Sequence, residues 1–312
     1  MGTPGLTKQG FLRLSGPVLA GVASLSFYSA IVFVPAVGIF LGLFSPLPLI
    51  RELASGRSPL LAWGWVLVVL AGIALATQSL FLGLYTSGYL LLAVWPVATV
   101  EWWQRRVWTT GRWLAIVTLG SWIFASLLAI GLAGGGQVGE FFSQQAVSWV
   151  EANRNFAQFW TLGRQELMVS AASLVGYLSP ALAAMYTMGL GLWLRPRLVF
   201  PGFERGKEPF ARYASEEWLP LGFVAGALGW VFAPGIWGWL SANLLVTVVA
   251  LYFVHGTAIL LAYLGPKLGS NRWIKAAVVV FGVQLPVAFL YAALGLLDSF
   301  VKLRRTDEGS SV

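Results

Sequence analysis

The chain has 312 residues, of which 58% are hydrophobic and only 10% charged, and its formal net charge is +8. Soluble domains are about 45–50% apolar and about 25% charged, so this chain has too few charges to cover a water-soluble globule. With a mean hydropathy of +0.76, the composition predicts an all-α integral membrane protein. It has no cysteine and one histidine, so we expect no disulfide, no metal centre and no cofactor.

Crossing a bilayer as a helix takes about 20 apolar residues. After a short tail at 1–15, nine apolar stretches predict a single polytopic domain with about nine transmembrane helices: 16–34, 36–50, 60–82, 84–100, 113–133, 167–194, 219–233, 239–264 and 275–297. Pro35 divides the first pair, and Pro46 and Pro48 are expected to stop the second helix. Three prolines fall inside spans, where they predict kinks: Pro96, Pro180 and Pro286.

The segment 138–165 has a different pattern, with apolar and polar residues on opposite helical faces. We expect it to lie along the membrane surface as an external amphipathic helix. The apolar face comprises Phe142, Ala146, Trp149, Val150, Phe156 and Trp160, and the polar face Gln144, Ser148, Glu151, Arg154 and Gln158.

Basic residues predict the orientation of the chain. The tail and the segments 51–57, 101–112, 195–217 and 265–275 hold 15 of the 20 lysines and arginines. Because cytoplasmic loops are enriched in these residues, we expect these segments, including the long loop 195–218, in the cytoplasm of a bacterial inner-membrane protein, with the amino terminus inside. Nine crossings, however, would leave the polar tail 298–312, with Lys302, Arg304 and Arg305, outside. Eight crossings would bring it in, for example if 16–50 were re-entrant.

Ionisable residues inside the membrane are functional candidates, because burying a charge there costs at least about 2.5–3.5 kcal/mol. Glu101, Glu166 and Asp298 fall at span ends, which argues against a proton pump with a carboxylate relay. His255 lies well inside a span, with Tyr252 one turn earlier on the same face. Two interpretations stay open: a ligand-binding pocket with Tyr252, His255 and Gln284, or a histidine bonded to a neighbouring helix. Asn243 has the same two interpretations.

Small residues four apart predict close helix packing: Gly16, Ala20 and Ser24; Gly38 and Gly42; Gly222 and Gly226. The alternative for the first ridge is a docking face for a partner protein.

Common catalytic motifs are missing from the sequence. It has no GxxxxGK[ST], HExxH or GxSxG. We therefore expect neither an enzyme nor a chain that hydrolyses nucleotides by itself. The basic residues lie in short loops, so they indicate membrane orientation and not nucleic-acid binding.

Both ends of the chain resemble the YybS-like family of bacterial membrane proteins. FLGLFSPLPLIRELASGR is similar to a family hairpin that ends in Pro-x-Pro, here Pro46 and Pro48. YFVHGTAILLAYL is similar to a family helix with a paired motif, here His255-Gly256. LGLLDSFVKLRR is similar to a closing Gly-x-x-Asp followed by Arg, here Gly295, Asp298 and Arg304.

The resemblance implies a fold similar to the substrate-binding components of energy-coupling-factor vitamin transporters and to the cell-shape protein MreD. It leads to two functional hypotheses. The first is a substrate-binding subunit for a vitamin-like molecule, working with an ATP-hydrolysing partner module. The second is a non-catalytic membrane scaffold that binds envelope-assembly proteins.

Overall fold

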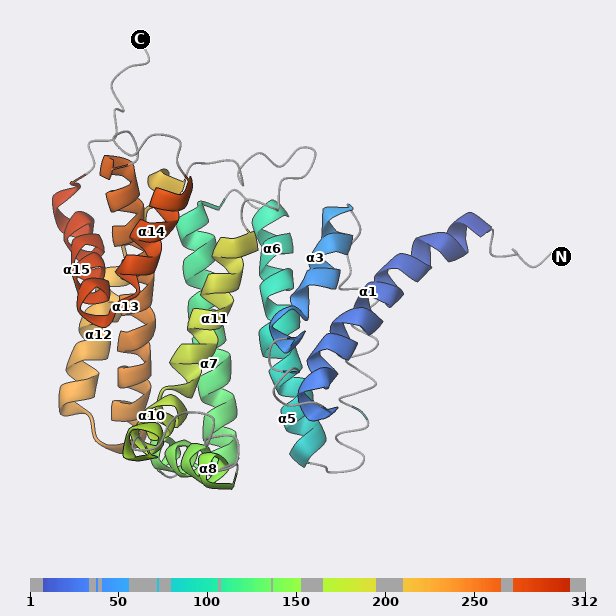
Figure 1. Cartoon of the computed structure of the whole chain (residues 1–312), viewed down its shortest axis with the longest axis horizontal. Helices are drawn as coiled ribbons and strands as arrows, with labels where there is room; N and C mark the ends of the chain where they lie inside the picture. The colour runs from blue at the N-terminus through green and yellow to red at the C-terminus, as the bar shows by residue number, and fades with distance from the viewer. Residues whose placement is uncertain are drawn as a thin grey trace, which may run out of the picture. The chain divides into compact units, whose positions relative to one another are not determined.

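The computed structural model describes residues 8–33, 41–55, 80–105, 108–135, 137–152, 165–194, 210–264 and 272–303, together with Gly38 and Gly72. Within these residues every regular element is a helix (Figure 1). The chain divides into two compact units. Unit 1 comprises Met1–Trp108 and Gly189–Lys207, and unit 2 comprises Thr109–Met188 and Glu208–Val312.

Unit 1 contains α1 (Lys8–Phe33), α3 (Pro46–Ala54), α5 (Leu80–Tyr89), the π-helical segment η1 (Leu90–Val94) and α6 (Trp95–Arg105). The helical residues 41–43 are followed by a turn at 44–45, and α3 begins at Pro46, so a helix does end before Pro46, whereas Pro48 lies inside the next helix and stops none. Proline is well placed in a first helical turn, because its missing N–H would have no partner there. The π-helical segment comes directly before Pro96, where the missing N–H disturbs the helical hydrogen bonds and a kink was expected. Pro35 and nearly all of 60–82 lie outside the described residues.

The small-residue ridge of α1 packs inside unit 1. Ala20 is buried, and Ser24 is fully buried with its hydroxyl 2.7 Å from that of Tyr89. Tyr28 packs against Tyr89 with its ring edge-on, at a centroid distance of 5.2 Å. These contacts support packing within the chain for Ala20 and Ser24, and not a free docking face. Gly38 and Gly42 are buried as well.

Unit 2 carries the remaining helices. They are α7 (Thr110–Ala133), α8 (Val138–Ala152), α10 (Gln165–Tyr177), α11 (Ser179–Leu194), the 3-10 turn η4 (Phe210–Arg212), α12 (Leu219–Phe232), α13 (Gly235–Leu264), α14 (Arg272–Gly282) and α15 (Leu285–Val301). The end of α11 belongs to unit 1.

A glycine ridge holds α12 against α13, as the sequence predicted. A Cβ added to Gly226 would lie 3.0 Å from the Leu245 backbone, and one added to Gly222 would lie 3.3 Å from the Val248 side chain. Close backbone contact through small residues is typical of the packing between membrane helices.

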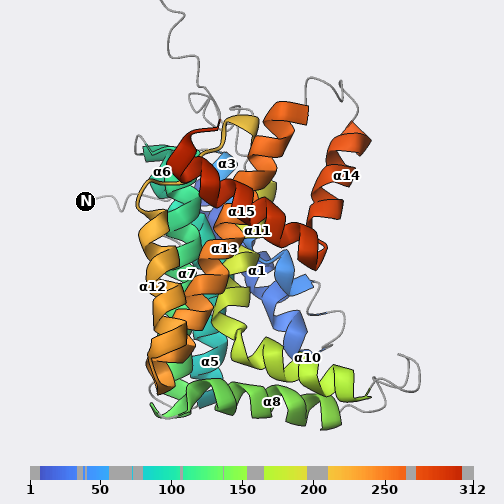
Figure 2. The same cartoon turned by 90° about the vertical axis from the view of Figure 1, so that its left-hand side faces the viewer.

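A helix, α8, begins at Val138, where the predicted amphipathic segment begins, and its position at a membrane surface stays a prediction. Figures 1 and 2 show α8 and α10 side by side at one end of unit 2, across the direction of α7 and α13. Gln144, Ser148 and Glu151 on the polar face are exposed, while Phe142 on the opposite face is half-buried. The Phe142 carbonyl would meet a Cβ on Gly176 at 2.3 Å, so α10 covers the inner face of α8. Residues 153–164 lie outside the described part of the chain.

The predicted span 167–194 is not one straight helix. α10 and α11 meet at a bend of 77°, beside Pro180. Trp239 donates its indole N–H to the Tyr177 carbonyl at 2.8 Å, and the Asn243 amide donates to the same oxygen at 3.2 Å. The Asn243 side-chain oxygen accepts from the Ala181 N–H at 3.2 Å. Asn243 therefore forms hydrogen bonds with backbone groups that have no helical partner at the bend. This supports the interpretation that Asn243 bonds to a neighbouring helix, and not the ligand-binding one.

Replacing Asn243 by Leu is expected to lower stability by about 1–3 kcal/mol. The Tyr177 carbonyl keeps the hydrogen bond from Trp239, but the Ala181 N–H loses its acceptor at a fully buried position, and a buried backbone group left unsatisfied costs about that much. Thermal unfolding of the purified protein in mild detergent measures the loss. Leu221→Ala on the exposed face of α12 is the matched control and should change little. Equal unfolding temperatures for both variants would contradict this role of Asn243.

The predicted final span 275–297 is in fact two helices. α14 ends at Gly282 and α15 begins at Leu285, with Pro286 in the first turn of α15. Tyr291 of α15 donates its hydroxyl back to the Val278 carbonyl of α14 at 3.2 Å. Tyr263, near the end of α13, donates to the Leu303 carbonyl at 2.7 Å. The chain thus leaves the end of α13, turns at 283–284 and returns to the end of α13 (Figure 2).

Two described helices, α7 and α13, are each long and apolar enough to cross a membrane, and α10 with α11 would make a third if counted as one broken span. Shorter apolar helices occur at Gly16–Ala30, Tyr85–Val100, Leu219–Phe232 and Leu285–Val301. The composition of these helices is compatible with a membrane protein. The count of nine crossings stays a prediction.

Candidate functional site: a buried histidine–aspartate pair

His255 lies on α13, the longest of the described helices at 30 residues. It is nine positions before the end of the helix at Leu264, about 14 Å along the axis at 1.5 Å per residue. The side chain is almost completely buried, with 3% of its surface exposed. A polar ring at such a position needs partners for both of its nitrogens.

Asp298 of α15 provides one partner. Its Oδ2 lies 2.9 Å from Nε2 of His255, and only 8% of its side-chain surface is exposed. Asp298, which the sequence placed at the end of a span, is therefore buried and paired with His255. Because α15 begins only at Leu285 and crosses α13 obliquely (Figure 2), Asp298 meets His255 within α13.

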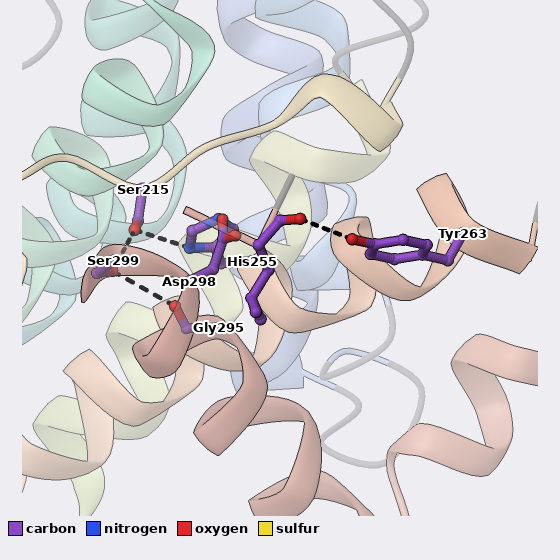
Figure 3. Close-up of polar contacts among 7 residues, drawn as sticks. Ser215, His255, Tyr263, Gly295, Asp298 and Ser299 are labelled. Atoms are coloured by element: carbon purple, nitrogen blue, oxygen red, sulfur yellow. Dashed lines mark hydrogen bonds and ion pairs between the residues drawn. The ribbon is translucent and has the colours of Figure 1, made fainter. Parts of the chain in front are cut away.

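Ser215 provides the second partner, from the segment between η4 and α12. Its Oγ lies 2.8 Å from Nδ1 of His255, and 3.5 Å from Oγ of Ser299. The close-up in Figure 3 shows Ser215, His255, Asp298 and Ser299 converging from these three elements. Asp298, His255 and Ser215 form a continuous row of polar groups, with Ser299 at the end of the row.

Two glycines allow this pair to form. A Cβ on Gly256 would lie 1.8 Å from the Tyr291 carbonyl oxygen, and a Cβ on Gly295 would lie 2.2 Å from the Tyr252 carbonyl oxygen. Real side chains do not fit at such distances, so α13 and α15 cross here in backbone contact. His255 and Asp298 stand one and three positions from these glycines, so the crossing brings them together.

The segment 213–218 is held in place at three points. Tyr213 is buried and packs edge-on against the His255 ring, at a centroid distance of 6.1 Å. A Cβ on Gly111 of α7 would lie 2.0 Å from the Ala214 carbonyl oxygen. Glu216 accepts a hydrogen bond from the hydroxyl of Thr109 at 2.9 Å. Ser215 is therefore fixed beside His255 by contacts on both sides.

Of the predicted ligand-binding residues, the structure buries Tyr252 and His255 one turn apart on α13. Gln284 is exposed at the start of α15, fourteen positions from Asp298 and about 21 Å along the helix. The structure thus does not bring Gln284 into the buried cluster. Among the motif residues, Gly256, Gly295 and Asp298 meet at the crossing, and Pro46 and Pro48 lie in α3 of unit 1. Arg304 lies outside the described residues.

Sequence reasoning missed Ser215 and the pairing of Asp298 with His255. Ser215 is 40 positions from His255, in a loop without helical periodicity, so no local pattern indicates it. The sequence did contain a signal for Asp298. It lies three positions after Gly295 in an apolar helix, and a glycine lets such a helix cross another at close range.

Comparison with known proteins adds no assignment, since no family model, curated protein or solved structure matches the chain.

Proposed function

We propose that the chain is a substrate-binding membrane component of a small-molecule transporter, with the pair His255 and Asp298 at its working centre. The proposal places it in a bacterial inner membrane with its amino terminus in the cytoplasm. Energy would come from an ATP-hydrolysing partner, as the resemblance to vitamin-transporter components implies.

The buried pair is the observation that carries the proposal. Desolvating two charges costs several kcal/mol each, and well-packed apolar residues of similar volume are often as stable or more stable. An ion pair buried between apolar helices therefore adds little net stability, because the desolvation of the two charges offsets most of their attraction. Ionisable groups in that position usually serve ions, protons or ligands in transport.

Replacement of His255 by Leu tests the proposal directly. If the cluster binds a ligand, the full-length protein purified in mild detergent should carry a small molecule that mass spectrometry detects, and His255→Leu should lose it. Thr257→Val on the same helix is the matched control, because it changes a polar side chain without touching the His255 contacts. A ligand retained by His255→Leu would overturn a binding role for this centre.

A membrane scaffold for envelope assembly is the second candidate. One observation favours it, because both ring nitrogens of His255 already bind side chains of the same chain. A scaffold predicts no small molecule in any preparation, recovery of envelope-assembly proteins alone, and a nearly silent His255→Leu variant.

Serine, histidine and aspartate are also the side chains of hydrolytic triads. In the chain described here the serine contacts Nδ1 and the carboxylate Nε2, and Ser215 is half-buried. A fluorophosphonate probe separates this possibility from transport. Covalent labelling that Ser215→Ala abolishes would identify a serine nucleophile and contradict the transport proposal.

A further inference from the structure

We propose that the hydroxyl groups of Tyr252, Ser299 and Ser215 form a binding site for one uncharged polar group, a carbonyl or a hydroxyl, of a small molecule. That this site selects the molecule which the chain carries rests on the proposed function above. The site itself is defined by the described side chains and can be tested with a simple probe.

The hydroxyl of Tyr252 is the observation that points to a ligand. Tyr252 is only 1% exposed, and its side-chain oxygen is buried without a hydrogen-bond partner among the described residues. Ser299 lies close enough to influence this oxygen, but not at the distance and angle of a hydrogen bond. Buried polar groups almost always have a partner, so this hydroxyl indicates one that comes from outside the chain.

The hydroxyl of Ser299 has only weak contacts within the chain. Its Oγ lies 3.4 Å from the Gly295 carbonyl oxygen and 3.5 Å from Oγ of Ser215. Hydrogen bonds from a hydroxyl to an oxygen are usually about 2.5–3.0 Å long, so both contacts are weak. Ser299 stands one turn after Gly295 on α15, and a Cβ on Gly295 would touch the Tyr252 carbonyl of α13. The crossing of the two helices therefore brings Ser299 beside Tyr252.

Ser215 borders the same place from the segment 213–218, and its side chain converges with that of Ser299 (Figure 3). This segment is not helical, Ser215 is half-buried, and Glu217 and Trp218 are exposed. A small molecule can therefore reach the hydroxyls from the side of this segment, while α13 and α15 stay in backbone contact.

The chemistry of the bound group follows from the three hydroxyls. Each has one donor position, two acceptor positions and no charge. Tyr252 and Ser299 can both donate to one carbonyl oxygen, or one can donate to a hydroxyl group and the other accept from it. A charged group would need a counter-charge at a buried position, and none of the three hydroxyls supplies one. The site therefore fits an uncharged group.

The single histidine is a reporter for this site. In full-length protein labelled with ¹⁵N-histidine and placed in lipid bilayers, every imidazole signal comes from His255. Ser215 contacts its ring at 2.8 Å, and Tyr252 lies one turn away on α13. Acetamide is an uncharged probe with a carbonyl group, and acetate is an anion of nearly the same size. At constant pH, we expect acetamide to shift the His255 signal until it saturates, and acetate to cause no saturable shift.

Tyr252→Phe tests the role of the hydroxyl. It should weaken acetamide binding about tenfold, the loss expected for one hydrogen bond. The new ring keeps the edge-on contact with Phe223, at a centroid distance of 6.5 Å, and the change removes no hydrogen bond of the oxygen to a described residue. Without probe, the unfolding temperature of this variant should therefore equal or exceed that of the wild type.

Tyr263→Phe is the matched control, because it makes the same change on the same helix. Tyr263 is exposed, and its hydroxyl bonds to the Leu303 carbonyl near the end of α13. This variant should bind acetamide as the wild type does.

The site would be excluded by the absence of a saturable shift with acetamide, by an equal shift with acetate, or by wild-type acetamide affinity in Tyr252→Phe. A lower unfolding temperature of Tyr252→Phe would show that its hydroxyl is bonded inside the protein, and would also exclude the site.

The proposed function has a separate outcome. A protein that binds acetamide through Tyr252 but carries no small molecule after purification would keep the site and reject the transport component. A co-purified molecule that Tyr252→Phe retains as well as the wild type would keep the transport component and show that these hydroxyls do not select what it carries.

Discussion

Single cysteines at positions 270 and 310 are expected to react on the same side of the membrane, and one at position 145 on the opposite side. α14 has 11 residues and α15 has 17, so at 1.5 Å per residue they are about 17 and 26 Å long. Both are shorter than the hydrocarbon core of about 30 Å. The bond from Tyr291 to Val278 joins α15 to α14, and the bond from Tyr263 to Leu303 holds the residues after α15 beside the end of α13. A re-entrant hairpin explains these contacts.

This topology also resolves the charge asymmetry in the sequence. With nine crossings, Lys302, Arg304 and Arg305 would be external, against the positive-inside rule. A hairpin that enters and returns places them with Lys267 in the basic loop. If the last apolar segment enters and leaves the membrane on the same side, the predicted nine crossings become eight. The segment 16–50 then need not be re-entrant.

The chain has no cysteine, so each introduced thiol is the only one present. A membrane-impermeant maleimide applied to intact cells should label Gln145→Cys on exposed α8. Ser270→Cys and Ser310→Cys should react only after the membrane is permeabilised. Labelling of position 310 together with position 145 would restore nine crossings and reject the re-entrant hairpin.

The sequence predicted the features that depend on local composition. The apolar stretches at 113–133 and 239–264 correspond to α7 and α13, because each is a single uninterrupted helix. The glycines at 222 and 226 predicted a close helix contact, because a residue without a side chain lets a neighbouring helix approach closely whichever helix that is. His255 stood out because it is the only histidine in the chain and lies within an apolar span.

The features that the sequence did not predict depend on distant parts of the chain. Pro180 and Pro286 indicated kinks, but hydropathy averages across a break, so the sequence did not show that each apolar segment is divided into two helices. Asp298 was placed at a membrane surface by counting along a span that the turn at 283–284 in fact divides. The role of Asn243 follows only from its contacts with Tyr177 and Ala181, more than 60 positions away.

Replacing Gly256 by Ala is expected to destabilise unit 2 and to separate His255 from Asp298. The added Cβ would lie 1.8 Å from the Tyr291 carbonyl oxygen, which belongs to the backbone of α15 and cannot move away by a rotamer change. Overpacking usually costs about 1–3 kcal/mol, and a clash with backbone should reach the upper end of that range.

Gly131→Ala is the matched control, because Gly131 lies in α7 with nothing within 4 Å of its added Cβ. Alanine is the better helix former by roughly 1 kcal/mol, so this variant should unfold at the same or a higher temperature than the wild type. Thermal unfolding in detergent compares the two variants, and the His255 ¹⁵N signal reports whether the pair survives. A Gly256→Ala protein that is as stable as the control and keeps the wild-type His255 signal would show that backbone contact between α13 and α15 does not position the pair. A loss of stability together with a changed His255 signal in Gly256→Ala alone would link the glycine crossing to the geometry of the site.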